Sequence, residues 1–74
     1  MEIPWVDGFA ISVRADVDEV TISANREGLL SLARQLTDLA QERPGSHIHY
    51  DDMNALEDGS DQLIVELVDP AHRR

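Results

Sequence analysis

The residues whose side chains are best suited to take part in chemistry are His47 and His49, which stand two positions apart and precede Asp51. On a β-strand, successive side chains point to opposite faces, so these three side chains would share one face. Ile48 and Tyr50 would point to the other face. This arrangement fits half of a metal site, a patch that titrates near neutral pH, or the solvated face of a strand.

The metal hypothesis rests on distance. Imidazoles two positions apart on a strand have Cα atoms about 6–7 Å apart and can converge on one ion. Asp51 or Glu66 would supply the third ligand of a site with two histidines and one carboxylate. A His-x-His pair without a third ligand at fixed spacing is common by chance, so we favour a solvated or hydrogen-bonded strand face and predict no metal and no other cofactor.

No catalytic set accompanies the histidines. Ser46 and His47 are neighbours on the predicted strand and point to opposite faces, so they cannot form a nucleophile and base pair. Ser12 or Ser23 could approach a histidine across a sheet, but no nucleophile elbow or oxyanion motif goes with them. Residues 57–61 form an acidic turn rather than a calcium loop, because the alternating acidic positions are missing. We therefore predict that the protein is not an enzyme.

Composition narrows the class further. The 74 residues predict one domain with a thin core, and the absence of cysteine excludes disulfides and thiolate metal sites and favours the cytoplasm. Fifteen acidic residues against six arginines give a net charge of −9. The negative electrostatic field of such a chain repels nucleic acid and anionic membranes and attracts cationic partners. The N-terminus lacks the pattern of a signal peptide, and no apolar run approaches the ~20 residues of a membrane span.

The first half of the chain predicts a hairpin and a helix. Residues 9–14 and 19–24 alternate apolar and polar positions, and the predicted core face of this hairpin is Phe9, Ile11, Val13, Val20 and Ile22. Asn25 is a helix N-cap and Pro44 and Gly45 stop the helix. Gly28 either permits close packing on a strand or indicates a later helix start. The apolar stripe at helical spacing consists of Leu29, Leu32, Ala33, Leu36, Leu39 and Ala40.

The second half predicts two more strands. Residues 47–50 form a short one, residues 51–60 a polar loop with Met53 and Leu56 beneath it, and residues 62–68 a central strand covered on both faces. If Val65 joins the core, Ile64 and Val68 reach the open face and form an apolar spot that a partner or a second copy would cover.

These elements predict an α+β fold of order ββαββ, with a mainly antiparallel four-stranded sheet and one helix on one face. The core spans about residues 9–68, residues 1–8 form an N-terminal arm, and residues 69–74 form a frayed tail. Trp5 in the arm is predicted to pack on the edge of the core rather than to anchor a partner. The uncovered sheet face would be polar and would carry Ser12, Arg14, Thr21, Ser23, His47, His49 and Glu66.

Three segments resemble a known family. Residues 22–33, with the sequence ISANREGLLSLA, resemble its entry into the helix. His47-Ile48-His49 and the acidic loop that follows resemble its histidine strand, and residues 56–60 and 63–66 resemble its last turn and strand. The family is number thirty-two of the immunity proteins of bacterial polymorphic toxin systems. It is frequent in actinobacteria, which agrees with a chain that has no lysine.

The resemblance implies an α+β protein without enzymatic activity that binds a cognate toxin domain and blocks it. A basic toxin would suit an acidic inhibitor by charge complementarity. The residues we expect at the interface are His47, His49, Asp51, Asp52, Glu57 and Asp58. The alternatives are a metal-binding or metal-sensing module that uses His47, His49 and Asp51, and a structural homodimer.

Overall fold

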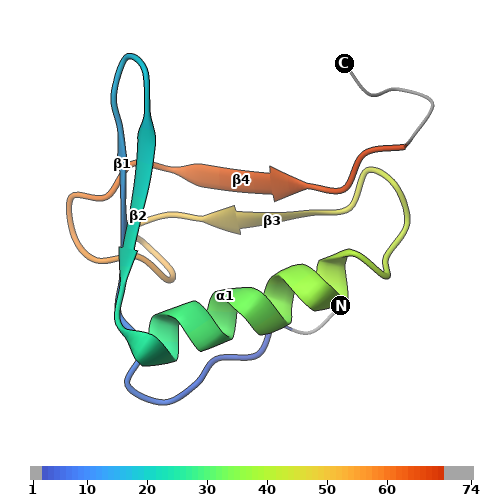
Figure 1. Cartoon of the computed structure of the whole chain (residues 1–74), viewed down its shortest axis with the longest axis horizontal. Coiled ribbons are helices and arrows are strands. Elements are labelled where there is room, and N and C mark those ends of the chain that lie inside the picture. Colours follow the sequence, from blue (N-terminus) through green and yellow to red (C-terminus); the bar gives the residue numbers. More distant parts are fainter. Residues whose placement is uncertain (1–2, 70–74) are drawn as a thin grey trace.

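The computed structural model describes residues 3–69 and has one helix between two pairs of strands. In chain order the elements are β1 (Ile11–Ala15), β2 (Val20–Ala24), α1 (Arg26–Leu39), β3 (His47–Tyr50) and β4 (Leu63–Glu66). Figure 1 shows the β1–β2 hairpin standing across one end of the β3–β4 pair, with α1 running along β3. The predicted order ββαββ and the α+β class are confirmed. Of the predicted tail, only residue 69 lies within the described part of the chain.

The strands form two separate antiparallel sheets, β1–β2 and β3–β4, rather than the predicted four-stranded sheet. The reason lies at the outer edge of β1, where the loop segment 57–61 takes the place of a neighbouring strand. The backbone N–H of Glu57 donates to the carbonyl of Ile11, and that of Asp61 donates to the carbonyl of Val13, both at 2.8 Å. An occupied edge cannot accept β3 or β4, so the second hairpin does not extend the first sheet on the β1 side.

The N-cap of α1 connects the helix to the hairpin. The Asn25 side-chain oxygen accepts from the backbone N–H of Gly28 at 2.7 Å and from that of Ala10 at 3.0 Å. Its amide nitrogen donates to the carbonyl of Gly8 at 2.9 Å. One side chain therefore satisfies a free donor of the first helical turn and fixes the segment that leads into β1. The predicted N-cap is confirmed.

Gly28 brings the helix close to the hairpin. A Cβ atom at this position would lie 2.7 Å from the carbonyl oxygen of Ala10, 2.8 Å from Cγ1 of Ile11 and 3.0 Å from Cβ of Ala24. The helix already begins at Arg26, so a later start does not explain the glycine. Of the two explanations the sequence left open, close packing on a strand is correct.

Only Leu32 and Leu39 of the predicted apolar stripe are buried, so the prediction of the buried face of α1 is correct only in part. Leu29 and Leu36 are 55% and 41% exposed, and Ala33 and Ala40 are exposed as well. The close contact at Gly28 sets the rotation of α1 about its own axis. Two hydrogen bonds with the N-terminal segment stabilise this orientation: Ser31 Oγ accepts from the backbone N–H of Val6, and the Gln35 side-chain amide donates to the carbonyl of Pro4. The residues that α1 buries are Gly28, Ser31, Leu32, Gln35 and Leu39.

Tyr50 lies at the centre of the core and is fully buried. Its hydroxyl donates to the side-chain oxygen of Gln35 at 2.7 Å, so this polar pair is satisfied without water. Trp5 stacks on Phe9 with ring centroids 4.2 Å apart and meets Tyr50 edge-on at 6.3 Å. Trp5 thus packs against the core, as predicted. The other fully or nearly buried apolar side chains are Ile11, Val13, Leu32, Leu39, Ile48 and Leu56.

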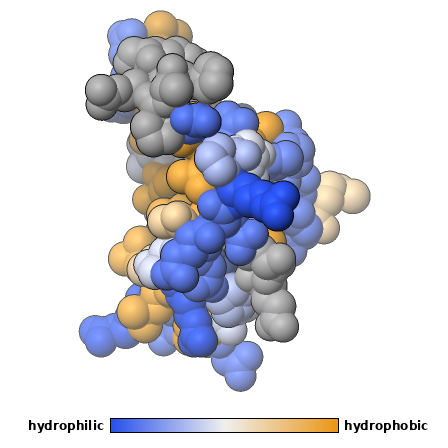
Figure 2. Space-filling view, turned by 90° about the vertical axis from the view of Figure 1, so that its right-hand side faces the viewer, coloured by the Kyte–Doolittle hydropathy of each residue, from blue (hydrophilic) through white to orange (hydrophobic). Residues whose placement is uncertain are grey.

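Three further predictions about the core are wrong in part. Val20 and Ile22 are 60% and 43% exposed, because β2 is the open edge of its sheet and nothing covers its outer half. Leu56 packs beneath the loop as expected, whereas Met53 is exposed. The last strand is shorter than predicted and is an edge strand with alternate residues exposed, since β3 is its only neighbour. Figure 2 shows apolar side chains reaching the surface between hydrophilic ones.

Candidate functional site

The uncovered face of the β3–β4 pair carries both histidines. His47 pairs with Glu66 and His49 with Ile64, so these four side chains share a face, while Ile48 is buried on the other. The two imidazole centroids are 5.6 Å apart. We call His47, His49, Ile64 and Glu66 the histidine face. The predicted alternation along the histidine strand is confirmed.

Apolar surface lies within this polar face. Ile64 is 52% exposed and Val68, just beyond β4, is 49% exposed, while Val65 is half-buried against the core. This is the arrangement expected if Val65 entered the core. Partly exposed isoleucine beside imidazole and carboxylate groups gives a surface that can both bury apolar area and form hydrogen bonds with a partner.

Asp51 does not join the histidines as a third ligand. One of its carboxylate oxygens accepts from the backbone N–H of Met53 at 2.9 Å, and its carbonyl accepts from the N–H groups of Ala55 and Leu56 at 3.1 and 2.9 Å. The chain leaves the strand at this residue, and the carboxylate stabilises the turn. Within residues 3–69, no three histidine or carboxylate side chains are grouped so that they could hold a metal ion.

The remaining predicted site residues follow β3 around the end of the sheet. Asp52 is exposed in the turn. Glu57 is fixed to β1 by its backbone N–H, with its side chain exposed, and Asp58 is exposed one position further on. The six predicted residues therefore extend along residues 47–58 and do not form one compact cluster.

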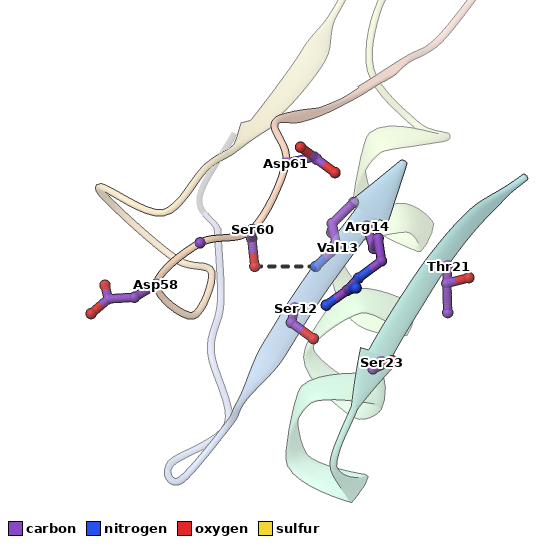
Figure 3. A pocket seen from close by; sticks show the side chains of 9 residues that line it. Ser12, Val13, Arg14, Thr21, Ser23, Asp58, Ser60 and Asp61 are labelled. Carbon is purple, nitrogen blue, oxygen red and sulfur yellow. Dashed lines mark hydrogen bonds between the residues drawn. The ribbon is translucent and has the colours of Figure 1, made fainter. Parts of the chain in front are cut away.

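A second polar surface lies on the outer face of the β1–β2 hairpin (Figure 3). The cavity here has a volume of about 520 Å³. Ser12 and Arg14 come from β1, Thr21 and Ser23 from β2, and the far wall is the loop 58–61. We call this cavity the hairpin groove. The sequence predicted that these four strand residues would share a face with the histidines, but the two sets lie on different sheets.

Hydrogen bonds accepted by side chains of the loop 58–61 close the hairpin groove on one side. Ser60 Oγ accepts from the backbone N–H of Val13 at 3.2 Å, and a carboxylate oxygen of Asp61 accepts from that of Ala15 at 2.7 Å. The Asp58 carboxylate points away from β1 (Figure 3). The periodicity of the sequence does not predict these hydrogen bonds to the outer edge of β1. A loop whose side chains bond to a strand edge, in place of a neighbouring strand, has no alternating pattern of apolar and polar residues.

The groove offers hydrogen-bonding and charged groups. Its lining provides the hydroxyls of Ser12, Thr21, Ser23 and Ser60, the Arg14 guanidinium and the carboxylates of Asp58 and Asp61. The groove is therefore suited to binding a polar segment.

Together these features define a small α+β protein with two polar, uncovered surfaces. A family comparison agrees with this description: the model for Immunity protein 32 matches residues 19–68, and the chain belongs to that family. The match covers β2, α1, β3 and β4 and includes the histidine face; β1 precedes it. Comparisons with curated proteins and with solved structures found no match. Within the described residues, no helix has the length and apolar character needed to cross a membrane.

Proposed function

We propose that this protein is a non-enzymatic inhibitor that binds a cognate toxin domain in the cytoplasm and blocks it. Family membership over residues 19–68 supports a toxin-neutralising role. The chemistry of the two surfaces agrees with this role, because both can form hydrogen bonds with a partner.

The histidine face is our proposed centre of the toxin interface. The observation behind this proposal is the 52% exposure of Ile64 between histidine and glutamate side chains, on a face that no other element covers. A partner that covers Ile64 gains hydrophobic stabilisation of about 25 cal/mol for each Å² of apolar area buried. The imidazoles can donate and accept hydrogen bonds around it.

The acidic residues that follow β3 extend the proposed interface. Asp51, Asp52, Glu57 and Asp58 continue from the histidine strand to the wall of the hairpin groove. Together with the chain's net charge of −9, these four carboxylates favour a basic toxin and speed its association at low ionic strength. Nucleic acid and anionic membranes are repelled by the same field, so we do not propose them as partners.

The test uses a candidate toxin domain chosen from the proteins that the genes neighbouring this protein's gene encode. Purified protein should form a 1:1 complex with it and abolish its activity. The double variant H47A/H49A should bind at least about tenfold more weakly, the loss expected when residues at the centre of an interface are truncated. Arg34→Ala, on the exposed side of α1, is the control and should bind as the wild type does.

The outcomes separate two claims. Failure to form any complex would refute the function itself. A complex whose affinity is the same for H47A/H49A and the wild type would refute the histidine face as its centre. Because His47 and His49 are exposed, the double variant should keep the wild-type circular dichroism spectrum and unfolding temperature.

A further inference from the structure

The outer edge of β2 is an open strand edge. Within residues 3–69 its sheet consists of β1 and β2, and the loop 57–61 already occupies the other edge. The pairing with β1 runs from Ile11 opposite Ala24 to Ala15 opposite Val20 without a bulge. The edge is therefore regular over the full length of β2.

The hydrogen-bond pattern shows which groups point outward. Asn25 donates to the carbonyl of Ala10, and Asp16 donates to the carbonyl of Glu19 at the other end of the hairpin. Because bonded and non-bonded pairs alternate in an antiparallel ladder, Thr21 and Ser23 make the bonds to β1. The backbone N–H and C=O groups of Val20, Ile22 and Ala24 then point away from β1.

This edge lacks the features that protect natural edge strands. The sequence of β2 is VTISA, with no lysine, no proline and no charge. Val20 and Ile22 are 60% and 43% exposed on one side of the strand. Natural sheets usually shield such an edge with charged residues, proline or a bulge. A partner's extended strand can pair with such an unprotected edge through backbone hydrogen bonds and so add a strand to the sheet.

We propose that β2 pairs with an extended strand of the toxin, so that the toxin completes the hairpin sheet. This inference rests on the proposed function and adds a second attachment site to it. Thr21 and Ser23 line the hairpin groove, so a strand laid along β2 would also border that groove. Its side chains would be apolar where they lie beside Val20 and Ile22 and polar where they lie beside Thr21 and Ser23.

Charge favours a basic strand over a second copy of this chain. The hairpin turn at the start of β2 contains Asp16, Asp18 and Glu19, all exposed. A strand with lysine or arginine at the end nearest this turn gains from that charge. Two copies would instead bring together chains that each carry a net charge of −9.

Residue-resolved amide hydrogen exchange tests the pairing. In the free protein, the amides of Ile22 and Ala24 should exchange fast, while those of Thr21 and Ser23 are protected by β1. In the toxin complex, the Ile22 and Ala24 amides should slow at least about tenfold. A complex that forms without this slowing overturns the inference and leaves the proposed function standing. Failure to form a complex counts against the function instead.

Variants at Ile22 give an independent test. Ile22→Pro removes the outward N–H without removing a bond to β1, and Ile22→Lys introduces the charge that edge strands normally carry. Both should weaken toxin binding at least about tenfold, whereas Ile22→Val keeps the edge and should bind normally. If Ile22→Pro does not fold, the exchange measurement on the wild type decides. Protection of the Ile22 amide that rises with protein concentration in the absence of toxin would show self-pairing and overturn the proposal.

Discussion

Replacing Gly28 with alanine should destabilise the protein, although alanine is the better helix former. In an open helix, this change gains about 1 kcal/mol from backbone entropy. Here the new Cβ would lie 2.7 Å from a backbone carbonyl oxygen and 2.8 Å from Ile11 Cγ1. The carbonyl belongs to Ala10 and accepts from Asn25 at 3.1 Å, so it cannot move without weakening the N-cap region.

The magnitude follows from these two opposing terms. Overpacking a tight contact costs about 1–3 kcal/mol, and an immobile backbone atom places this case at the upper end. After the gain in helix propensity, the net loss in the free energy of unfolding should be about 1–2 kcal/mol. For a domain of this size, that loss lowers the unfolding temperature by roughly 5–15 °C.

Urea unfolding followed by circular dichroism measures this loss, with Ala33→Gly as the matched control. Ala33 lies on the exposed side of the same helix, so the control should lose about 1 kcal/mol from propensity alone. Glycine should therefore be favoured at position 28 and alanine at position 33. Stabilisation by Gly28→Ala of about 1 kcal/mol would refute the close packing of α1 on the hairpin.

Three other predictions concern polar contacts. Tyr50→Phe leaves the Gln35 side-chain oxygen without its donor and should cost about 1–3 kcal/mol in urea unfolding. Burial raises the pKa of Tyr50 above 10.0, so the unfolded state loses its proton first and stability should fall as the pH rises above 10.0; this fall should be smaller in Tyr50→Phe. Asp61→Ala should cost about 1 kcal/mol, whereas Asp61→Asn keeps an acceptor for Ala15 and should stay close to wild type.

Local patterns predicted the histidine strand and the N-cap correctly because neighbours in sequence determine both. Alternation along residues 47–50 is enough to place His47 and His49 opposite Ile48 and Tyr50. The capping role of Asn25 requires only a helix that begins beside it. In such cases the physical cause is contained within a few residues of the chain.

Leucine spacing predicted only Leu32 and Leu39 of the buried face of α1. Ser31 and Gln35 are each 1% exposed, because their polar atoms meet Val6 and Pro4 from the N-terminal segment. A hydrophobicity pattern assigns such residues to solvent, since it does not include the partners that satisfy them. Gln35 is thus buried, and Leu29 exposed, through contacts that are distant in sequence.

The two-sheet arrangement escaped prediction for a similar reason, and it also explains the surfaces available for binding. A four-stranded sheet under one helix would have had a single uncovered face. Because the loop 57–61 closes β1 through Ser60 and Asp61, the second hairpin is separated and keeps its own uncovered face with the histidines. The same closure leaves β2 as the open edge of the first sheet. This division leaves the two uncovered surfaces and the open edge of β2 on which our proposed toxin interface rests.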